Sequence, residues 1–528
     1  MKLNQGLKLK ELGMLTPLVT DYLMGKSGLE RLYTHKPEMA SIQAAIDAKQ
    51  SFSNREVLVN ALYHQYNGYD LSTQTQQNIE ALKKENTFSV CAAHQLCLFT
   101  GPSFFIFKIL SAIKLSQELK AQFPQHNFVP VYWMGSEDHD FEEISKAMLY
   151  GKPITWENDE KGAIGRYSLR GIDTSIDQLS DLIGSLDHGE KFISDLKHFF
   201  SGNGSYGKAF QAWILDLFKS YGLLVIDQDD TQLKALIQPI IKSELLDGVI
   251  QKNLKSNEAY LNKTYHVQAN SRDLNLFYLK DQIRSRIERK GDDFVVVNTK
   301  LNFTEKEMLQ ELKEHPERFS PNVFLRPIYQ ETILPNVAFI GGPGEIAYWL
   351  QLKDVFDFFK VYQPVVLLRD MAVMMNSSHL QKIKDWEIEI SDLFTHYDQI
   401  AKKFIAQESQ NLLSLNSEKE SIQAIFSLIK SRAMSIDRNL ERSVDAEQQK
   451  VFNSLSNIES KLIRAEKRNF EQQLNQLDNI QNKLLPNKIL QERFENFVPV
   501  YLKNKDTYFE ILLESFNPFE QSLKVFEI

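Results

Sequence analysis

The distribution of glycine and proline constrains this chain more than any single motif. Every glycine lies at or before Gly344, and neither glycine nor proline occurs from Val365 to Leu485. Both residues favour turns, because glycine permits a positive φ and proline lacks a backbone donor. A stretch this long without either, rich in Lys, Glu, Gln, Leu and Ile, predicts long helices.

Within that stretch, apolar residues recur three, four or seven positions apart between charged residues, a spacing typical of a coiled coil. A break of five residues before the third group would shift the apolar seam. Pro486 is expected to end the helix. The first group comprises Ile422, Ile425, Ile429, Ile436 and Leu440, the second Leu455, Ile458, Leu462 and Ala465, and the third Phe470, Leu474, Leu477 and Leu484.

Two antiparallel arms of about 45 residues would each be roughly 65 Å long at about 1.5 Å per residue. A bare arm of this length exposes its seam, so either its own return helix or a second copy of the chain must cover it. We therefore expect a helical coiled-coil arm over residues 376–486 that forms a homodimer. Residues 487–528 are expected to return to the core.

Before Val365, short apolar runs alternate with helical stretches, a pattern typical of a mostly parallel sheet covered by helices. Residues 104–120 have helical spacing and separate the first two runs as a βαβ crossover does. We expect an α/β domain over residues 1–375, with an N-terminal helical segment and insertions at about 151–220 and 230–320. The runs are TFSVCAA before His94, NFVPVYWM before Gly135, GLLVID ending at Asp227, DFVVVN from Asp293, NVAFI before Gly341 and PVVLL before Arg369.

Composition excludes several classes of protein. Apolar residues make up 43% and charged residues 25%, as in ordinary globular proteins, which excludes a disordered chain. The net charge of -8 gives no basic face for nucleic acid. No apolar run approaches the ~20 residues that span a bilayer, and no secretory signal begins the sequence. Cys91 and Cys97 cannot form a disulfide framework, which favours a cytoplasmic protein.

Polar groups follow the expected strands, where ligands bind in open α/β sheets. His94 and Gln95 follow the first strand and lead through Thr100 and Gly101 into a helix. Such a turn suits phosphate, because glycine allows close approach and a histidine can stabilise developing charge. The alternative is a structural histidine followed by an ordinary turn.

Glu137, Asp138, His139 and Asp140 follow the second strand. Carboxylates suit Mg²⁺, and an Asp or His can orient or deprotonate an amine. Equally, the segment could be a helix N-terminus with Ser136 as its cap and acids in the first turn.

A third polar segment surrounds Arg326, which could clamp a carboxylate or phosphate bidentately or form an internal salt bridge. Gly341, Gly342 and Gly344 then lead into a helix with Glu345 in its first turn. Glycines there let a ligand or another backbone come close.

Three patterns imitate known sites. Gly202 to Lys208 has P-loop spacing, but Ala209 replaces the hydroxyl that holds Mg²⁺ and a helical pattern precedes it. Cys91, His94 and Cys97 suggest zinc, but in an extended strand His94 would point away from both thiols, so no zinc is expected. The acidic cluster 227–230 is expected to be a loop before a capped helix.

Taken together, these segments resemble the BshC family, the cysteine ligases of bacillithiol biosynthesis. Their order runs through nearly the whole chain, although Leu96 and Cys97 stand where the family frequently has Pro-Gly. The likeness rests on HQ (94–95), LFTGP (98–102), WM (133–134), EDHDF (137–141), RPIYQETILP (326–335), GGPGEIAYW (341–349) and, more weakly, YGL (221–223) and LQER (490–493).

The resemblance implies a Rossmann-like core, related to class I aminoacyl-tRNA synthetases, with connecting-peptide insertions and a dimerising C-terminal coiled coil. It implies an ATP-dependent, amide-forming ligase that joins the carboxyl group of cysteine to the amine of glucosaminyl-malate, the last step of bacillithiol synthesis, with Mg²⁺ accompanying the nucleotide. Two other functions remain open: a module that binds a nucleotide or thiol metabolite without ligation, and a dimeric scaffold.

The resemblance also implies roles for individual residues. The catalytic set would be His94, which would stabilise phosphate, with Asp138 and His139, which would orient or deprotonate the amine. The nucleotide would contact Gln95, Thr100, Gly101, Gly341, Gly342 and Gly344. The acceptor or amino-acid pocket would be shaped by Glu137, Arg326, Gln330, Glu345 and Trp349.

Overall fold

A computed structural model describes residues 1–202, 204–409 and 414–528. Asn203 of the P-loop-like segment and residues 410–413 of the expected arm lie outside these residues. The chain divides into two compact units, one of residues 1–373, 492–526 and 528, the other of residues 374–491 and 527. Each unit is described by itself.

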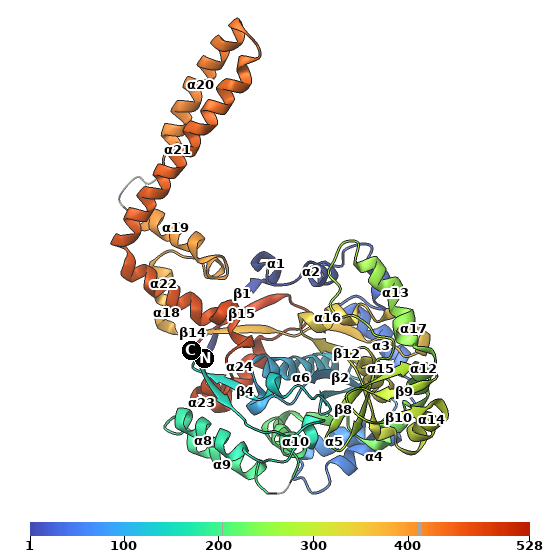
Figure 1. Cartoon of the computed structure of the whole chain (residues 1–528). Coiled ribbons are helices and arrows are strands. Elements are labelled where there is room, and N and C mark those ends of the chain that lie inside the picture. Colours follow the sequence, from blue (N-terminus) through green and yellow to red (C-terminus); the bar gives the residue numbers. More distant parts are fainter. Residues whose placement is uncertain (203, 410–413) are drawn as a thin grey trace. The chain divides into compact units, whose positions relative to one another are not determined.

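The first unit is built on a five-stranded parallel sheet in the order β13-β12-β2-β3-β6. Figure 1 labels two of its strands, β12 and β2. The chain adds strands on one side of β2 and then on the other, so the order switches between β2 and β12, where open α/β sheets bind ligands. Five of the six expected strands are confirmed. They are β2 (Thr87–His94), β3 (Asn127–Met134), β6 (Leu224–Asp227), β12 (Asn336–Gly341) and β13 (Val365–Leu368).

The expected crossover helix is also confirmed as α6 (Phe104–Gln122), between β2 and β3. Its residues Ala112, Leu115 and Leu119 pack with strand residues and with α3 (Ile42–Lys49) in one buried cluster. Seven of the eight residues of β3 and all six of β12 are buried, so these strands are buried on both faces, which explains their near-continuous apolar sequence.

The sixth expected strand, β9 (Asp293–Val296), does not belong to the parallel sheet. It lies in an antiparallel sheet of order β10-β9-β8-β7-β11 within the second insertion. Only Phe294 and Val296 of β9 are buried, so the apolar run is a half-buried, alternating strand rather than a core strand. The other strands are β7 (Leu276–Lys280), β8 (Ile283–Lys290), β10 (Asn302–Thr304) and β11 (Phe319–Pro321).

Helices and smaller strands complete this unit, including a sheet of order β1-β15-β14. The N-terminal segment holds β1 (Lys2–Lys8), α1 (Leu9–Leu12), α2 (Pro17–Leu23), α4 (Arg55–Gln65) and α5 (Thr73–Ala81); the first insertion holds α7 (Phe141–Ile144), β4 (Lys146–Leu149), β5 (Lys152–Thr155), α8 (Ile172–Ile183), α9 (Gly189–Phe199) and α10 (Tyr206–Leu217); the second holds α11 (Thr231–Ala235), α12 (Gln238–Asp247), α13 (Val249–Leu261) and α14 (Glu305–Glu314). Later elements are α15 (Leu325–Ile333), α16 (Pro343–Trp349), α17 (Lys353–Phe359), β14 (Met371–Met375), α23 (Val498–Asn504), α24 (Tyr508–Ser515) and β15 (Ser522–Glu527).

The second unit is helical and contains an antiparallel hairpin of α20 (Asn416–Ile436) and α21 (Leu440–Asn469), which lie side by side (Figure 1). The longer helix has 30 residues, hence about 45 Å, so the expected length of about 65 Å is wrong. The return arm breaks at Phe470, where the apolar spacing breaks, and the helix ends before Pro486 as expected. The remaining helices are α18 (Ser377–Asp385), α19 (Tyr397–Glu408) and α22 (Glu471–Leu484).

The hairpin leaves much of its apolar seam uncovered. None of the residues of α20 or α21 is buried, and Ile425 and Ile436 are 54% and 82% exposed. The return helix therefore does not cover the seam by itself. Among the described residues, no helix combines the length and the apolar character needed to cross a membrane.

Candidate functional site

A cavity of about 390 Å³ opens at the carboxyl ends of β2, β3, β12 and β13, at the switch in strand order. It gathers side chains from segments that are more than 200 residues apart in the sequence, such as His94 and Arg369. Seven residues singled out from the sequence line it: His94, Gln95, Asp138, Arg326, Gly342, Gly344 and Glu345. The expected cleft at the rim of the sheet is therefore present.

The acidic segment after β3 does not enter the cavity as a unit. Asp138 lines the cavity, whereas Glu137 is fully buried in an ion pair with Lys234 and accepts a hydrogen bond from Ser320. His139 does not line the cavity, because its Nδ1 lies 2.7 Å from Nη1 of Arg284.

The alternative interpretation of this segment, a helix capped by Ser136, is also wrong in its detail. The N-cap of α7 is Asp140, whose carboxylate accepts from the backbone N–H of Glu143 at 3.3 Å. Ser136 instead donates to the buried carboxylate of Asp227.

The turn after β2 is unusual, because Phe99, Thr100 and Gly101 all have positive φ values. A β-branched residue such as Thr100 rarely adopts this conformation. Its hydroxyl is buried without a hydrogen-bond partner, and neither Thr100 nor Gly101 lines the cavity. Asn496 holds the turn, since its side-chain amide donates to the carbonyls of Phe99 at 2.8 Å and Gly101 at 2.6 Å.

Three further residues expected at the site lie behind it. Gln330 is buried and donates to Glu331, while the Trp349 ring stacks on Phe339 with centroids 4.2 Å apart. Gly341 is the last residue of β12 and is not part of the cavity wall. None of the three is part of the cavity wall.

His94 is a neutral imidazole in this environment. Burial and the nearby charge of Lys108 lower its pKa to about 3. Its Nδ1 lies 3.1 Å from the carbonyl oxygen of Gln95, so the Nδ1–H tautomer donates there and leaves the lone pair of Nε2 available. The Sγ of Cys97 lies only 3.9 Å from Nδ1, so the expectation that His94 points away from Cys97 is wrong, because the chain turns after the strand.

Asp138 is held as a carboxylate by arginines. Burial would raise its pKa, but Arg326 and Arg284 together lower it to about 2. Arg326 contacts both carboxylate oxygens, with Nη1 3.3 Å from Oδ2. The internal salt bridge is therefore present, and Arg326 still lines the cavity with a buried Nε that has no partner.

Lys108, a residue that sequence reasoning missed, joins three parts of the site. It is 2% exposed, donates to the Ala93 carbonyl at 2.7 Å and forms an ion pair with Glu345. Glu345 also accepts the Gly342 N–H at 2.8 Å. A lysine inside the apolar run FFIFKIL was the available signal, since a buried lysine needs a partner.

Two arginines flank Phe104 at another wall of the cavity. The guanidinium carbons of Arg369 and Arg493 lie 5.0 and 5.4 Å from its ring centroid. Arg369 is buried and paired with Glu492. Sequence reasoning noted Arg369 at a strand end, but found Arg493 only as part of a weak motif.

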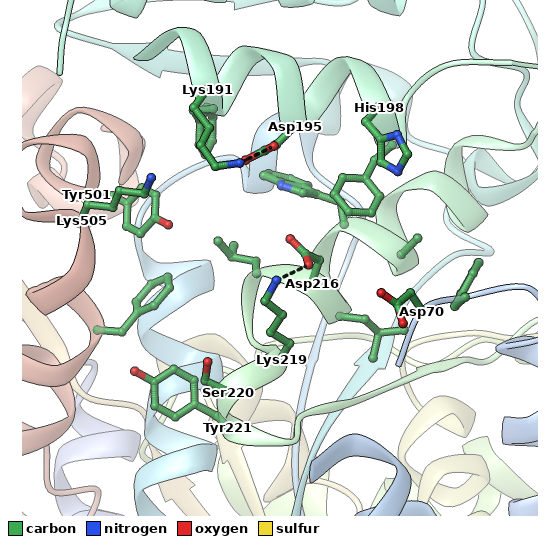
Figure 2. Close-up of a pocket in the computed structure, with 18 of the residues that line it drawn as sticks. Asp70, Lys191, Asp195, His198, Asp216, Lys219, Ser220, Tyr221, Tyr501 and Lys505 are labelled. Atoms are coloured by element: carbon green, nitrogen blue, oxygen red, sulfur yellow. Dashed lines mark hydrogen bonds and ion pairs between the residues drawn. The ribbon is translucent and has the colours of Figure 1, made fainter. Parts of the chain in front are cut away.

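A second cavity, of about 1040 Å³, is lined by α9, α10, α24 and neighbouring turns (Figure 2). Two of its three lysines are paired with acids on the same segment: Lys191 with Asp195 and Lys219 with Asp216, each at 2.9 Å. Of the residues singled out from the sequence, only Tyr221, from the weaker YGL motif, lines it, and none of the proposed site residues does. The smaller cavity is therefore the candidate active site.

The acidic cluster after β6 is a loop before a capped helix, as expected. Asp230 accepts from the backbone of Gln232 at 2.9 Å and Leu233 at 3.1 Å, and Asp229 pairs with Arg166 and Lys234. In the part of the chain that the structure describes, no three His, Cys, Asp or Glu residues are grouped to hold a metal ion.

Comparison with protein families gives two matches. Residues 1–370 match the model described as "Bacillithiol biosynthesis BshC, N-terminal Rossmann-like domain", and residues 372–528 the one described as "Bacillithiol biosynthesis BshC, C-terminal coiled-coil domain".

Curated relatives match over nearly their full length. The chain is 38% identical to a protein of Flavobacterium johnsoniae over 519 residues, 98% of each chain, and 38% identical to one of Cytophaga hutchinsonii over 95% and 94% of the two chains. A more distant relative from Salinibacter ruber is 29% identical over 511 residues. Each of the three is named "Putative cysteine ligase BshC".

Proposed function

Since the chain belongs to the BshC family, we propose that it is an ATP-dependent ligase that joins cysteine to the amine of glucosaminyl-malate, completing bacillithiol. The observation that carries the proposal is the cavity at the switch in strand order, with His94, Asp138, Arg326 and Glu345 on its wall.

The reaction needs an activated carboxyl group, because a free carboxylate is a poor electrophile. In the proposed sequence, the cysteine carboxylate attacks the α-phosphate of ATP and pyrophosphate leaves. The acceptor amine then attacks the resulting carboxyl–phosphate anhydride, the new C–N bond forms, AMP leaves and the amine loses a proton. A water-poor cavity protects the anhydride from hydrolysis.

The pKa values and hydrogen bonds of the site residues decide which role each residue can take in this reaction. A carboxylate with a pKa of about 2 is a weak base, so Asp138 orients the amine rather than deprotonates it. His94, neutral and with Nε2 unprotonated, can accept a hydrogen bond from the attacking amine, but with a pKa of about 3 it too is a weak base. We assign His139 no substrate contact, because it faces Arg284.

The nucleotide would lie along Gln95 and the Gly342–Pro343–Gly344 turn, which line the same cavity. The described residues offer single carboxylates rather than a metal cluster, so Mg²⁺ would arrive with the phosphates it neutralises.

Thiol profiling by mass spectrometry in a strain that lacks this chain tests the reaction class. We expect bacillithiol to disappear and the unthiolated amino-sugar conjugate to accumulate. The purified chain with cysteine, ATP and glucosaminyl-malate should form the product. Calorimetric binding of ATP or cysteine without any product would instead favour the binding module.

We further propose that the chain is a homodimer through α20 and α21. The exposed seam of these helices supports this, because a large apolar stripe in water is costly. Light scattering should give twice the monomer mass, and a double change of Ile425 and Ile429 to Glu should give the monomer. A monomeric wild-type chain would contradict the proposal.

A further inference from the structure

One wall of the cavity is formed by Arg369, Phe104 and Arg493. The proposed reaction gives these residues no role. Six charged side chains line the cavity, three acids and three arginines. Arg326 is paired with Asp138, Arg369 with Glu492 and Glu345 with Lys108. Among the described residues, Arg493 has no hydrogen bond or ion pair, and its guanidinium lies over the Phe104 ring.

The residues around the Arg493 guanidinium favour the binding of an anion. Arg369 places a second positive charge on the same ring, and Glu492 offsets only part of the field. The Nε of Arg369 is a buried donor without a partner. Stacking on Phe104 restricts the plane of the Arg493 fork, which lowers the entropy lost when the fork binds a planar partner. Burial and the charge of Arg369 also lower the pKa of Arg493.

Charge counting favours a carboxylate over a bare phosphate chain. Of the charged side chains that line the cavity, Glu143 and Arg493 have no ion-pair partner among the described residues, so the Arg493 guanidinium is available to neutralise one carboxylate. A polyphosphate would instead face Asp138, Glu143 and Glu345 and would need its own metal ion. Arginine matches carboxylate geometry with two parallel N–H donors.

The carboxylate that is bound here should keep its charge through the reaction. The cysteine carboxylate becomes neutral when it is activated, and an arginine bound to it would stabilise the ground state more than the transition state. On the basis of the proposed function, we infer that Arg493, supported by Arg369 and Phe104, binds a non-reacting carboxylate of the acceptor and thereby selects acidic amino-sugar conjugates.

Steady-state kinetics of Arg493→Gln and Arg493→Lys test the assignment. Arg493→Gln should raise the KM for glucosaminyl-malate about 10- to 100-fold, the effect of losing a charge-assisted hydrogen-bond pair. The KM values for cysteine and ATP, and kcat at saturating acceptor, should stay unchanged. The KM of Arg493→Lys for glucosaminyl-malate should lie between those of wild type and Arg493→Gln, because lysine keeps the positive charge but lacks the two parallel N–H donors. Lys219→Gln, which removes a charge from the larger cavity, is the matched control.

A carboxylate-free acceptor sharpens the test. With methyl glucosaminide as the amine, wild type and Arg493→Gln should have the same KM. Three results with Arg493→Gln would each overturn the inference. They are a higher KM for methyl glucosaminide, an equal rise in the KM for cysteine or ATP, and an unchanged KM for glucosaminyl-malate.

Calorimetry separates this inference from the ligase proposal. Malate alone should bind wild type and bind Arg493→Gln about 10-fold more weakly or worse, while inorganic phosphate should not distinguish them. If no ligation occurs but malate binding depends on Arg493, the ligase proposal fails and the subsite stands. If the product forms but malate does not bind wild type, or binds both equally, the subsite fails.

Discussion

The two cavities differ in how their charges are paired, and this difference separates the candidate active site from the larger cavity better than their volumes do. In the larger cavity, lysines pair with acids three or four positions away on an exposed surface. In the smaller one, the pairs join distant segments, such as Lys108 with Glu345 and Arg369 with Glu492. Local pairs stabilise a helix slightly, whereas buried distant pairs fix the positions of specific groups.

The largest expected contrast between the two regions is in stability. Lys234 is buried between Glu137 and Asp229, directly behind the cavity wall at Asp138. Lys234→Met removes the ion-pair partner of the buried Glu137 carboxylate and one of the two partners of Asp229, which keeps Arg166, and should lower the free energy of unfolding by about 3–5 kcal/mol. Lys219→Met in the larger cavity should change it by less than about 1 kcal/mol. Urea denaturation of both variants measures this, and similar losses would remove the contrast.

Catalysis should depend on one cavity only. His94→Ala should lower kcat about 10²- to 10³-fold, because the group proposed to contact the attacking amine is lost. His198→Ala, the matched histidine of the larger cavity, should change the rate by no more than about 2-fold. Full activity of the purified His94→Ala enzyme would show that the smaller cavity is not the site of ligation.

Acid stability provides a third comparison. The pKa of Asp138 is about 2, against an ordinary value of 3.8, so its charged form stabilises the fold by about 2 kcal/mol above pH 4. This contribution is lost as the pH falls through 2. Asp138→Asn should therefore be less stable than wild type at neutral pH and approach it in acid. Asp195→Asn, from the larger cavity, should show no such pH-dependent difference.

The smallest effect concerns the pH profile. The charge of Lys108 helps to hold the pKa of His94 near 3, so Lys108→Met should raise that pKa. Because the neutral imidazole is the active form, the acidic fall in activity should move to higher pH. Lys108→Arg keeps the charge and should retain the wild-type profile. An unchanged acidic limb in Lys108→Met would argue against this coupling.

Much of the fold was predictable because buried parallel strands are almost continuously apolar. β2, β3, β6, β12 and β13 satisfy this rule, and the side chains that follow them gather at one rim of the sheet. The rule failed at β9, where an unbroken apolar run alternates between buried and half-buried positions.

The direction of individual side chains was not predictable. Glu137, Asp138 and His139 are consecutive, but a loop turns them toward Lys234, the cavity and Arg284 respectively. Lys108 and Arg493 reach the site through tertiary contacts, and only Lys108 leaves a local signal, a charge within an apolar run. Resemblance placed the right segments at the cavity, while packing decided which of their atoms face a ligand.

Asn496 holds the turn after β2 by hydrogen bonds, and this has a consequence for folding during translation. A ribosome makes all five strands of the parallel sheet, and then the entire helical unit, before it makes Glu492, Arg493 and Asn496. Until these residues leave the ribosome, Arg369 lacks its ion-pair partner Glu492, and the turn after β2 lacks its hydrogen bonds to Asn496. A nascent chain therefore carries an unfinished pocket, and catalytic competence arrives only near the completion of translation.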